Sequence, residues 1–365
     1  MKLMTIFGTR PEIIRLSVII KQLDRFCKHI LVHTGQNFDE KLSDVFFREL
    51  GLRQPDVYLG VHGADFADQV GQIITRVNKV VEDVKPDRVM ILGDTNSGLA
   101  TIVAARKGIP IFHLEAGNRC YDDRVPEEIN RRIIDHCSTI LMPYTNRSRD
   151  NLLREGIEPD RIFVIGNPIY EVLNTHAPQI ELNSIVSKLG LEPHQYFLVT
   201  MHREENVDDP KRLGNLLEGL ERLVSIYEQH VVVSLHPRTR DKMQQYTLDV
   251  RSELIHLLDP LGFFDFVALE RNARCVLTDS GTVQEECCIF GVPNVTIRDV
   301  TERPETIECG SNILSGADPD IIAQAVDLVL NSSRDWTPPS EYIEQHVSTA
   351  VAKIVLGYRS HSLQR

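Results

Sequence analysis

The amino-acid sequence predicts an α/β protein built from two doubly wound parallel sheets, one in each half of the chain. Short apolar runs alternate with amphipathic helical patterns, which is typical of βαβ units. Several runs are apolar at consecutive positions, as expected for strands that are buried on both faces. The alternation pauses at about residues 171–195 and then restarts, and 365 residues are enough for two or three domains of about 150 residues each.

The first half of the chain contains apolar runs that we expect to form strands, each followed by a turn or a helical pattern. The expected strands lie at residues 2–7, 29–34, 88–93, 109–114, 139–144 and 161–166. The expected helices lie at residues 11–25, 39–50, 96–107, 126–137 and 146–155. In the second half, strands are expected at 196–201, 230–235, 254–259, 274–279 and 292–297, and helices at 210–228, 282–290 and 318–331.

These patterns suggest where the domains begin and end. We expect a first domain at residues 1–172, a second at 173–345, and a C-terminal helical segment at 346–365 that packs back on the first domain. Ligands of open α/β sheets bind outside the carboxyl ends of the strands. Two such domains facing each other would form a cleft lined by strand-end loops, so these loops are where functional residues are expected.

Composition excludes several classes of protein. The 40 basic and 52 acidic residues give a net charge of −12, which disfavours binding to nucleic acid or to an anionic membrane through a general basic surface. No run approaches the roughly 20 apolar residues of a membrane span, and no secretory signal is recognisable. The seven cysteines are scattered without a C-x-x-C pair, so neither a disulfide framework nor a zinc site is indicated. We expect a cytoplasmic protein.

The first strand-end motif is Gly8-Thr9-Arg10-Pro11-Glu12. Pro11 suits the first turn of a helix, where backbone N–H groups together with the Arg10 guanidinium can hold a phosphate. The alternative is an ordinary strand-to-helix turn with an exposed arginine.

Two carboxylates follow neighbouring apolar runs. Asp94 comes directly after the run at 88–93, and Glu115 directly after the run at 109–114. If both lie in one crevice, shared negative charge and partial burial raise one pKa, as a general acid or base requires. The alternative for Asp94 is that it caps a helix, whereas no obvious helix starts after Glu115.

A charged segment follows at residues 118–136. Pro126 fits the first position of a helix, which puts Glu127 and Glu128 in the first turn and makes Glu127 and Arg131 i,i+4 neighbours. The alternative is a solvated helix start with ordinary surface ion pairs.

Two motifs in the second half have the same placement. His202, flanked by Arg203, follows the run at 196–201 and could contact a phosphate or act as an acid or base, although a structural histidine is the alternative.

The run at 274–279 leads through Ser280, Gly281 and Thr282 into a helix, and this turn supplies the donors that a diphosphate needs. Glu286 lies about one turn further and could accept two ribose hydroxyls through its two oxygens.

With these motifs in this order, the chain resembles the bacterial non-hydrolysing UDP-N-acetylglucosamine 2-epimerase family over nearly its whole length. The motifs are GTRPE (8–12), HTGQ (33–36), GDTNS (93–97), HLEAG (113–117), PEEINR (126–131), HREEN (202–206), DSGTVQEE (279–286) and TERPE (301–305). The resemblance implies a glycosyltransferase-B-type fold of two Rossmann-like domains, with UDP held mainly by the second domain. It also implies inversion at C2 of a UDP-2-acetamido sugar, and we expect a homodimer.

The resemblance further implies roles for individual residues. The residues at the family's catalytic positions are Asp94, Glu115, Glu127 and His202; those at its nucleotide-contacting positions are Arg10, Ser280, Gly281, Thr282 and Glu286; Arg131 and Arg303 would support the site. The family reaction is anti elimination of UDP to a 2-acetamidoglycal, followed by re-addition with the opposite configuration at C2, without NAD, metal or other cofactor. This route agrees with the low acidity of the C2 hydrogen, because loss of a stabilised diphosphate assists its removal.

Three segments of the sequence bear on the expected regulation and substrate. Asn37-Phe38 and Ser234–Pro237 differ from the common family pattern where regulated members bind an activating UDP-N-acetylglucosamine, so no activator is expected. Residues 117–126 resemble the branch that converts UDP-2-acetamido-2,6-dideoxy-L-talose to UDP-N-acetyl-L-fucosamine for capsule or O-antigen synthesis. The alternatives are a UDP-N-acetylglucosamine/UDP-N-acetylmannosamine 2-epimerase, a hydrolysing epimerase that releases free sugar, a glycosyltransferase of the same fold, and a non-catalytic UDP-sugar sensor.

Overall fold

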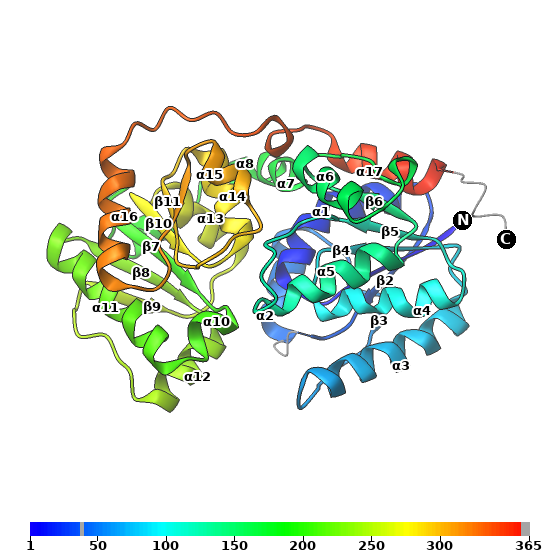
Figure 1. Ribbon diagram of the computed structural model, residues 1–365, viewed down its shortest axis with the longest axis horizontal. Helices are drawn as coiled ribbons and strands as arrows, with labels where there is room; N and C mark the ends of the chain where they lie inside the picture. Colours follow the sequence, from blue (N-terminus) through cyan, green and yellow to red (C-terminus); the bar gives the residue numbers. More distant parts are fainter. Residues whose placement is uncertain (37–39, 359–365) are drawn as a thin grey trace. The chain divides into compact units, whose positions relative to one another are not determined.

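The computed structural model describes residues 1–36 and 40–358, which form two compact α/β units (Figure 1). Unit 1 is made of Met1–Thr175 and Ser340–Arg365, and unit 2 of His176–Pro339. The domain boundaries expected from the sequence, at 172/173 and 345/346, differ by a few residues from the boundaries of these two units. Residues 340–345 belong to unit 1, where the Asn167 amide donates a hydrogen bond to the Glu341 carbonyl oxygen at 2.7 Å.

Unit 1 contains a six-stranded parallel sheet in the order β3-β2-β1-β4-β5-β6. Its strands are β1 (Lys2–Phe7), β2 (Lys28–His33), β3 (Val57–Tyr58), β4 (Arg88–Leu92), β5 (Ile111–Leu114) and β6 (Ile140–Met142). This is the doubly wound order, in which the direction of winding reverses between β1 and β4. Ligands of such sheets bind at the carboxyl ends of the strands beside this switch point.

Helices cover both faces of the first sheet. On one face α1 packs against α2, α7 and α17, and on the other α3, α4, α5 and η1 pack against one another. The helices are α1 (Arg10–Asp24), α2 (Glu40–Glu49), α3 (Phe66–Val84), η1 (Asn96–Ala100), α4 (Thr101–Arg106), α5 (Pro126–Cys137), α6 (Asn146–Arg154), η2 (Pro159–Arg161), α7 (Ile169–Thr175), η3 (Ser340–Tyr342) and α17 (Val347–Gly357). Alternate residues of each strand point to opposite faces, so Met4 and Ile6 pack in the core under α3, α4 and α5.

Unit 2 repeats the architecture with the order β12-β11-β10-β7-β8-β9, so its switch point lies between β7 and β10. Its strands are β7 (Tyr196–Met201), β8 (His230–Leu235), β9 (Ile255–Leu258), β10 (Cys275–Thr278), β11 (Asn294–Thr296) and β12 (Asn312–Leu314). The helices are α8 (Ala177–Glu181), α9 (Ile185–Lys188), α10 (Glu204–Val207), α11 (Pro210–Tyr227), α12 (Pro237–Tyr246), α13 (Phe263–Arg271), α14 (Gly281–Phe290), α15 (Pro304–Glu308) and α16 (Pro319–Asn331).

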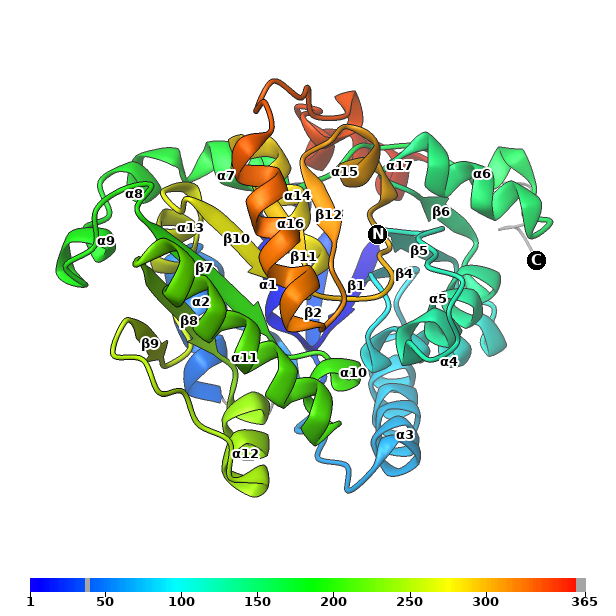
Figure 2. The same cartoon turned by 60° about the vertical axis from the view of Figure 1, so that its left-hand side comes forward.

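The core of unit 2 has two layers, one on each side of the sheet. Phe197 and Val199 pack with α11 and α16, which lie side by side in Figure 2, whereas Tyr196 and Leu198 pack with the helices of the opposite face. All six residues of β7 are buried. The predicted fold class, with strands buried on both faces, is confirmed.

Some elements differ from the expectation. Residues 161–166 were expected to form a strand, but they make only one bridge, between Ile162 and Leu141, and a short 3-10 turn precedes them. The helix α3 was not expected, and neither were the strands β3 and β12, which are too short to give a clear pattern. Within the described part of the chain, no helix combines the length and apolar character needed to cross a membrane.

Candidate active site

The switch point of the first sheet brings three of the motifs into direct contact. A Cβ atom added to Gly8 at the end of β1 would lie 2.0 Å from Thr34 Oγ1 and 2.3 Å from Ser97 Oγ. The two hydroxyls are 2.7 Å apart, and the Ser97 amide and hydroxyl donate hydrogen bonds to Gln36 Oε1. GTRPE, HTGQ and GDTNS therefore meet at one point, where only glycine fits at position 8.

Glu12 joins the first and third of these motifs. Its buried carboxylate accepts hydrogen bonds from the Gly8 and Thr9 amides, from the Thr9 hydroxyl and from the Thr95 hydroxyl. Burial raises the pKa of Glu12 to about 7, although these hydrogen bonds oppose the shift. Arg10 at the start of α1 is half-buried, with its guanidinium carbon 5.9 Å from the centre of the Phe46 ring.

Glu115 lies beside the same strand ends and is paired with a buried arginine. Arg15 Nη1 is 2.6 Å from Glu115 Oε2, and the two side chains are 2% and 11% exposed. Glu115 has a φ of +66°, a left-handed conformation that costs a residue with a Cβ about 1–2 kcal/mol and that is often found at functional sites. Arg15 was not among the predicted site residues. Its place one turn after GTRPE was the available signal.

Asp94 is held by α5. Arg131 Nε donates to Asp94 Oδ2 at 2.7 Å, and Asn130 Nδ2 donates to the Asp94 carbonyl oxygen at 3.0 Å. The alternative interpretation of Asp94 as a helix cap is wrong, because Thr95 occupies the N-cap position of η1. A Cβ on Gly93 would lie 3.5 Å from Glu115 Oε2, so the Asp94 and Glu115 segments are neighbours.

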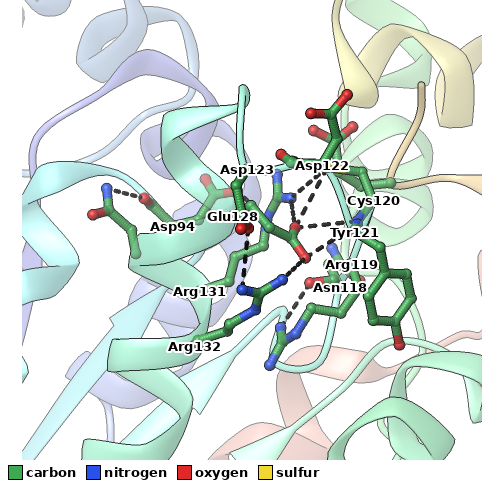
Figure 3. Close-up of polar contacts among 12 residues, drawn as sticks. Asp94, Asn118, Arg119, Cys120, Tyr121, Asp122, Asp123, Glu128, Arg131 and Arg132 are labelled. Carbon is green, nitrogen blue, oxygen red and sulfur yellow. Dashed lines mark hydrogen bonds and ion pairs between the residues drawn. The ribbon is translucent and has the colours of Figure 1, made fainter. Parts of the chain in front are cut away.

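The two glutamates of PEEINR lie in the first turn of α5 and differ in burial, and Figure 3 shows the contacts of Glu128. Glu128 is fully buried and accepts hydrogen bonds from the Cys120 and Tyr121 amides and from Arg131 Nη1. Burial alone would raise the pKa of Glu128, but the Cys120 amide and the Arg131 charge lower it below its ordinary value. Glu127 is half-buried. The alternative interpretation of this segment as a solvated helix start is therefore wrong, because Glu128 and Arg131 are buried.

A buried polar network around His113 and Asp135 holds the backbone that carries Asp94 and Glu115. His113 Nδ1 lies 2.8 Å from Asp135 Oδ1 and its Nε2 lies 2.9 Å from the Gly93 carbonyl oxygen. Asp135 Oδ2 also accepts from Arg119 Nη2 at 2.7 Å and from the Gly117 amide at 3.2 Å. This network ties the ends of β4 and β5 to α5 and so fixes the backbone around Asp94 and Glu115.

In unit 2, the switch point joins His202 to the end of β10. Asp279 is fully buried, and its Oδ2 accepts hydrogen bonds from the His202 amide at 2.8 Å and the Arg203 amide at 2.9 Å. His202 Nδ1 lies 3.2 Å from Asp279 Oδ1, and the imidazole is 37% exposed. Asp279 was not predicted as a site residue, although its position directly after an apolar run is the same signal that identified Asp94.

The start of α14 is the second feature of this unit. Ser280 is the N-cap, and Gly281 and Thr282 form the first turn of this ten-residue helix. Arg303 is ion-paired with Glu285, and a Cβ on Gly281 would lie 3.4 Å from Arg303 Cζ, so the guanidinium lies beside the helix N-terminus. This turn places backbone donors and a cation together, which suits a diphosphate.

The predicted residues thus fall into two groups. Unit 1 holds Arg10, Asp94, Glu115, Glu127 and Arg131, and unit 2 holds His202, Ser280, Gly281, Thr282, Glu286 and Arg303. Asn37 and Phe38, which bear on regulation, lie outside the described residues. In the described part of the chain, no group of three or more His, Cys, Asp or Glu side chains is arranged to hold a metal ion.

Comparisons with known proteins identify relatives whose similarity extends over both units of the chain. A family model described as UDP-N-acetylglucosamine 2-epimerase matches residues 21–356. A Methanocaldococcus jannaschii protein named UDP-N-acetylglucosamine 2-epimerase is 42% identical over 348 residues, which cover 93% of this chain and 95% of that protein. A Pseudomonas aeruginosa UDP-2,3-diacetamido-2,3-dideoxy-D-glucuronate 2-epimerase is 40% identical over 329 residues, covering 89% of this chain and 91% of that protein.

Among solved structures, the M. jannaschii UDP-GlcNAc 2-epimerase in complex with UDP-GlcNAc and UDP superposes on this chain with a TM-score of 0.93. The two are 39% identical, and the match covers 98% of this chain and 99% of the other.

Proposed function

The chain belongs to the UDP-N-acetylglucosamine 2-epimerase family, and from that premise we propose that it converts UDP-2-acetamido-2,6-dideoxy-L-talose to UDP-N-acetyl-L-fucosamine, for surface polysaccharide synthesis. At the coarser level it is a UDP-sugar 2-epimerase, an isomerase. The observation that carries the proposed epimerase chemistry is the pair of carboxylates Asp94 and Glu115, each ion-paired with a buried arginine beside the switch point of the first sheet.

The choice of substrate rests on the segment 117–126, which resembles the branch acting on the 6-deoxy sugar. This segment is built around the proposed catalytic residues. Asn118 Nδ2 donates to Glu115 Oε1 at 3.2 Å, and the Cys120 and Tyr121 amides hold Glu128, the neighbour of Glu127. The amino acids at positions 117–126 therefore influence the surroundings of Glu115 and Glu127. A 6-deoxy sugar lacks one hydroxyl, so its pocket has one polar group fewer to satisfy.

The proposed chemistry divides the work between the two groups of residues. Glu115 and Glu127 are the carboxylates that act on the sugar, one removing the C2 proton as the C1–O bond breaks and UDP departs. The product is a 2-acetamidoglycal, and UDP then adds back to C1 while a proton is delivered to the opposite face of C2. In unit 2, the α14 N-terminus and Arg303 stabilise the departing diphosphate. Asp94 and His202 complete the proposed catalytic group of four residues.

A second candidate substrate is UDP-N-acetylglucosamine, which would be interconverted with UDP-N-acetylmannosamine. The observation that favours it is the 42% identity to the M. jannaschii protein of that name, a relative that covers 93% of this chain. The chemistry at C2 is the same for both candidates.

The experiment that tests the function is incubation with a panel of UDP-2-acetamido sugars in deuterated water, followed by proton NMR. We expect deuterium at C2 of both epimers, without added NAD and in the presence of EDTA. Fastest turnover of the 6-deoxy-talose substrate supports the proposed branch, and fastest turnover of UDP-N-acetylglucosamine replaces it with the second candidate. Release of free 2-acetamido sugar would identify a hydrolysing enzyme, and a strict requirement for NAD would refute the mechanism.

A further inference from the structure

Two glutamates are buried next to each other between α13 and α14 of unit 2. Glu270 precedes the last residue of α13 and is 0% exposed, and Glu286 lies in α14 and is 3% exposed. The two helices pack against each other. Cys287, the residue after Glu286, donates a hydrogen bond from Sγ to Glu270 Oε1 at 3.4 Å. The catalytic scheme above makes no use of Glu270.

The second oxygen of Glu270 identifies its protonation state. Among the described residues no donor reaches Glu270 Oε2, which is buried. As a carboxylate, Glu270 would therefore keep a charged oxygen away from water without a hydrogen bond, at a high cost. As a carboxylic acid, the same oxygen becomes a donor, and it needs an acceptor instead.

The neighbouring carboxyl group of Glu286 would supply that acceptor. Burial, followed by the negative charge and the hydrogen bond of Glu286, raises the pKa of Glu270 well above its ordinary value, although the Cys287 thiol opposes the shift. Two carboxyl groups that share a buried site cannot both be ionised, so one of them retains its proton. Glu285, which lies on the same helix, does not share this buried carboxyl site, because the charge of Glu285 is compensated by Arg303.

We infer that Glu270 is a positioning residue for the nucleotide: as a neutral acid it donates a hydrogen bond to one oxygen of Glu286 and fixes that carboxylate for the ribose hydroxyls of UDP. This inference rests on the proposed role of Glu286 as the ribose acceptor. A carboxylate oxygen has two lone pairs, so an oxygen held by Glu270 can still accept from a hydroxyl. A carboxylate already held in place loses less conformational freedom when the ligand binds.

The test compares two substitutions of similar size at position 270. Glu270→Gln remains neutral and keeps an N–H donor, whereas Glu270→Met removes the donor. Dissociation constants for UDP and for 2′-deoxy-UDP are measured by calorimetry with each variant and with the unaltered protein. We expect Gln to keep the preference for UDP over 2′-deoxy-UDP to within about threefold. Met should weaken UDP binding about tenfold and 2′-deoxy-UDP binding, which retains only the 3′-hydroxyl contact, by about threefold.

Glu286→Met, which has no oxygen acceptor, separates the two levels of the inference. If Glu286→Met leaves the preference for UDP unchanged, the ribose role of Glu286 is wrong and the inference fails with it. If Glu286→Met abolishes the preference but Glu270→Met does not, only the positioning role of Glu270 is refuted. The infrared difference spectrum of the unaltered protein minus Glu270→Gln provides a measurement that does not need the Met variant to fold. It should contain the C=O stretch of a protonated carboxylic acid, and its absence overturns the inference.

Discussion

Gly117, the last residue of HLEAG, gives the sharpest test of how the backbone positions Glu115. It has a φ of +79°, and a Cβ atom added to it would lie 2.2 Å from the Ser148 carbonyl oxygen and 2.8 Å from Leu152 Cγ. The Gly117 amide also donates to Asp135 Oδ2 at 3.2 Å, within the network that supports the strand ends. Gly117→Ala therefore forces the loop away from α6.

The size of the effect follows from two contributions. A left-handed conformation costs alanine about 1–2 kcal/mol, and overpacking against atoms that cannot easily yield costs about 1–3 kcal/mol. The clash is with a backbone oxygen, so relieving it needs a shift of about 1 Å between the loop and α6. We expect Gly117→Ala to lower the free energy of unfolding by about 2–5 kcal/mol. A shift of this size beside Glu115 should lower kcat by about 10²-fold.

Gly108→Ala is the matched control. Gly108 also lies in unit 1 and has a φ of +68°, but among the described residues no atom other than those of Gly108 and its two chain neighbours lies within 4 Å of an added Cβ. This variant should therefore show only the conformational cost of about 1–2 kcal/mol, with unchanged kcat. Urea unfolding and steady-state turnover of both variants provide the comparison. The reasoning is refuted if Gly117→Ala is no less stable than Gly108→Ala and turns over at the normal rate.

Three further predictions concern the carboxylates of unit 1. Glu115→Gln and Glu127→Gln keep their shape but lose the ionisable site, so each should lower kcat by about 10²-fold or more at unchanged UDP affinity, and near-normal turnover of the folded variants would contradict the assignment. Asp135→Ala removes the partner of His113 Nδ1 and one of the two carboxylate partners of the buried Arg119, and it should cost about 3–5 kcal/mol in urea unfolding, whereas Asp123→Ala, at an exposed ion pair, should cost less than about 1 kcal/mol. Glu12 has a pKa raised from 4.5 to about 7, so its contribution to stability is present below pH 4.5 and is lost as the pH rises through 7. The stability of the protein relative to Glu12→Gln should fall by about 3 kcal/mol between pH 4.5 and 8, and parallel pH profiles would refute the shift.

The sequence by itself determined the fold class and the location of the functional motifs. Both depend on local patterns: a run of apolar residues predicts a buried strand, and polar residues directly after such a run must lie at the carboxyl edge of a parallel sheet. For this reason Asp94, Glu115 and Ser280 could be identified one motif at a time. The same local patterns did not predict the two-residue strand β3 or the three-residue strand β12, which are too short to show a period.

Only the tertiary structure decided which charges are partners. The i,i+4 spacing predicted Glu127 beside Arg131, but it could not predict that Arg131 pairs with the buried Glu128 and with Asp94, 37 residues away in the sequence. The contact between Glu270 and α14 could not be predicted either, because it depends on how two helices pack on one face of the second sheet. The physical reason is that a side chain's partners and its pKa depend on which segments fold together and exclude water, and neither property is encoded in the spacing along one element.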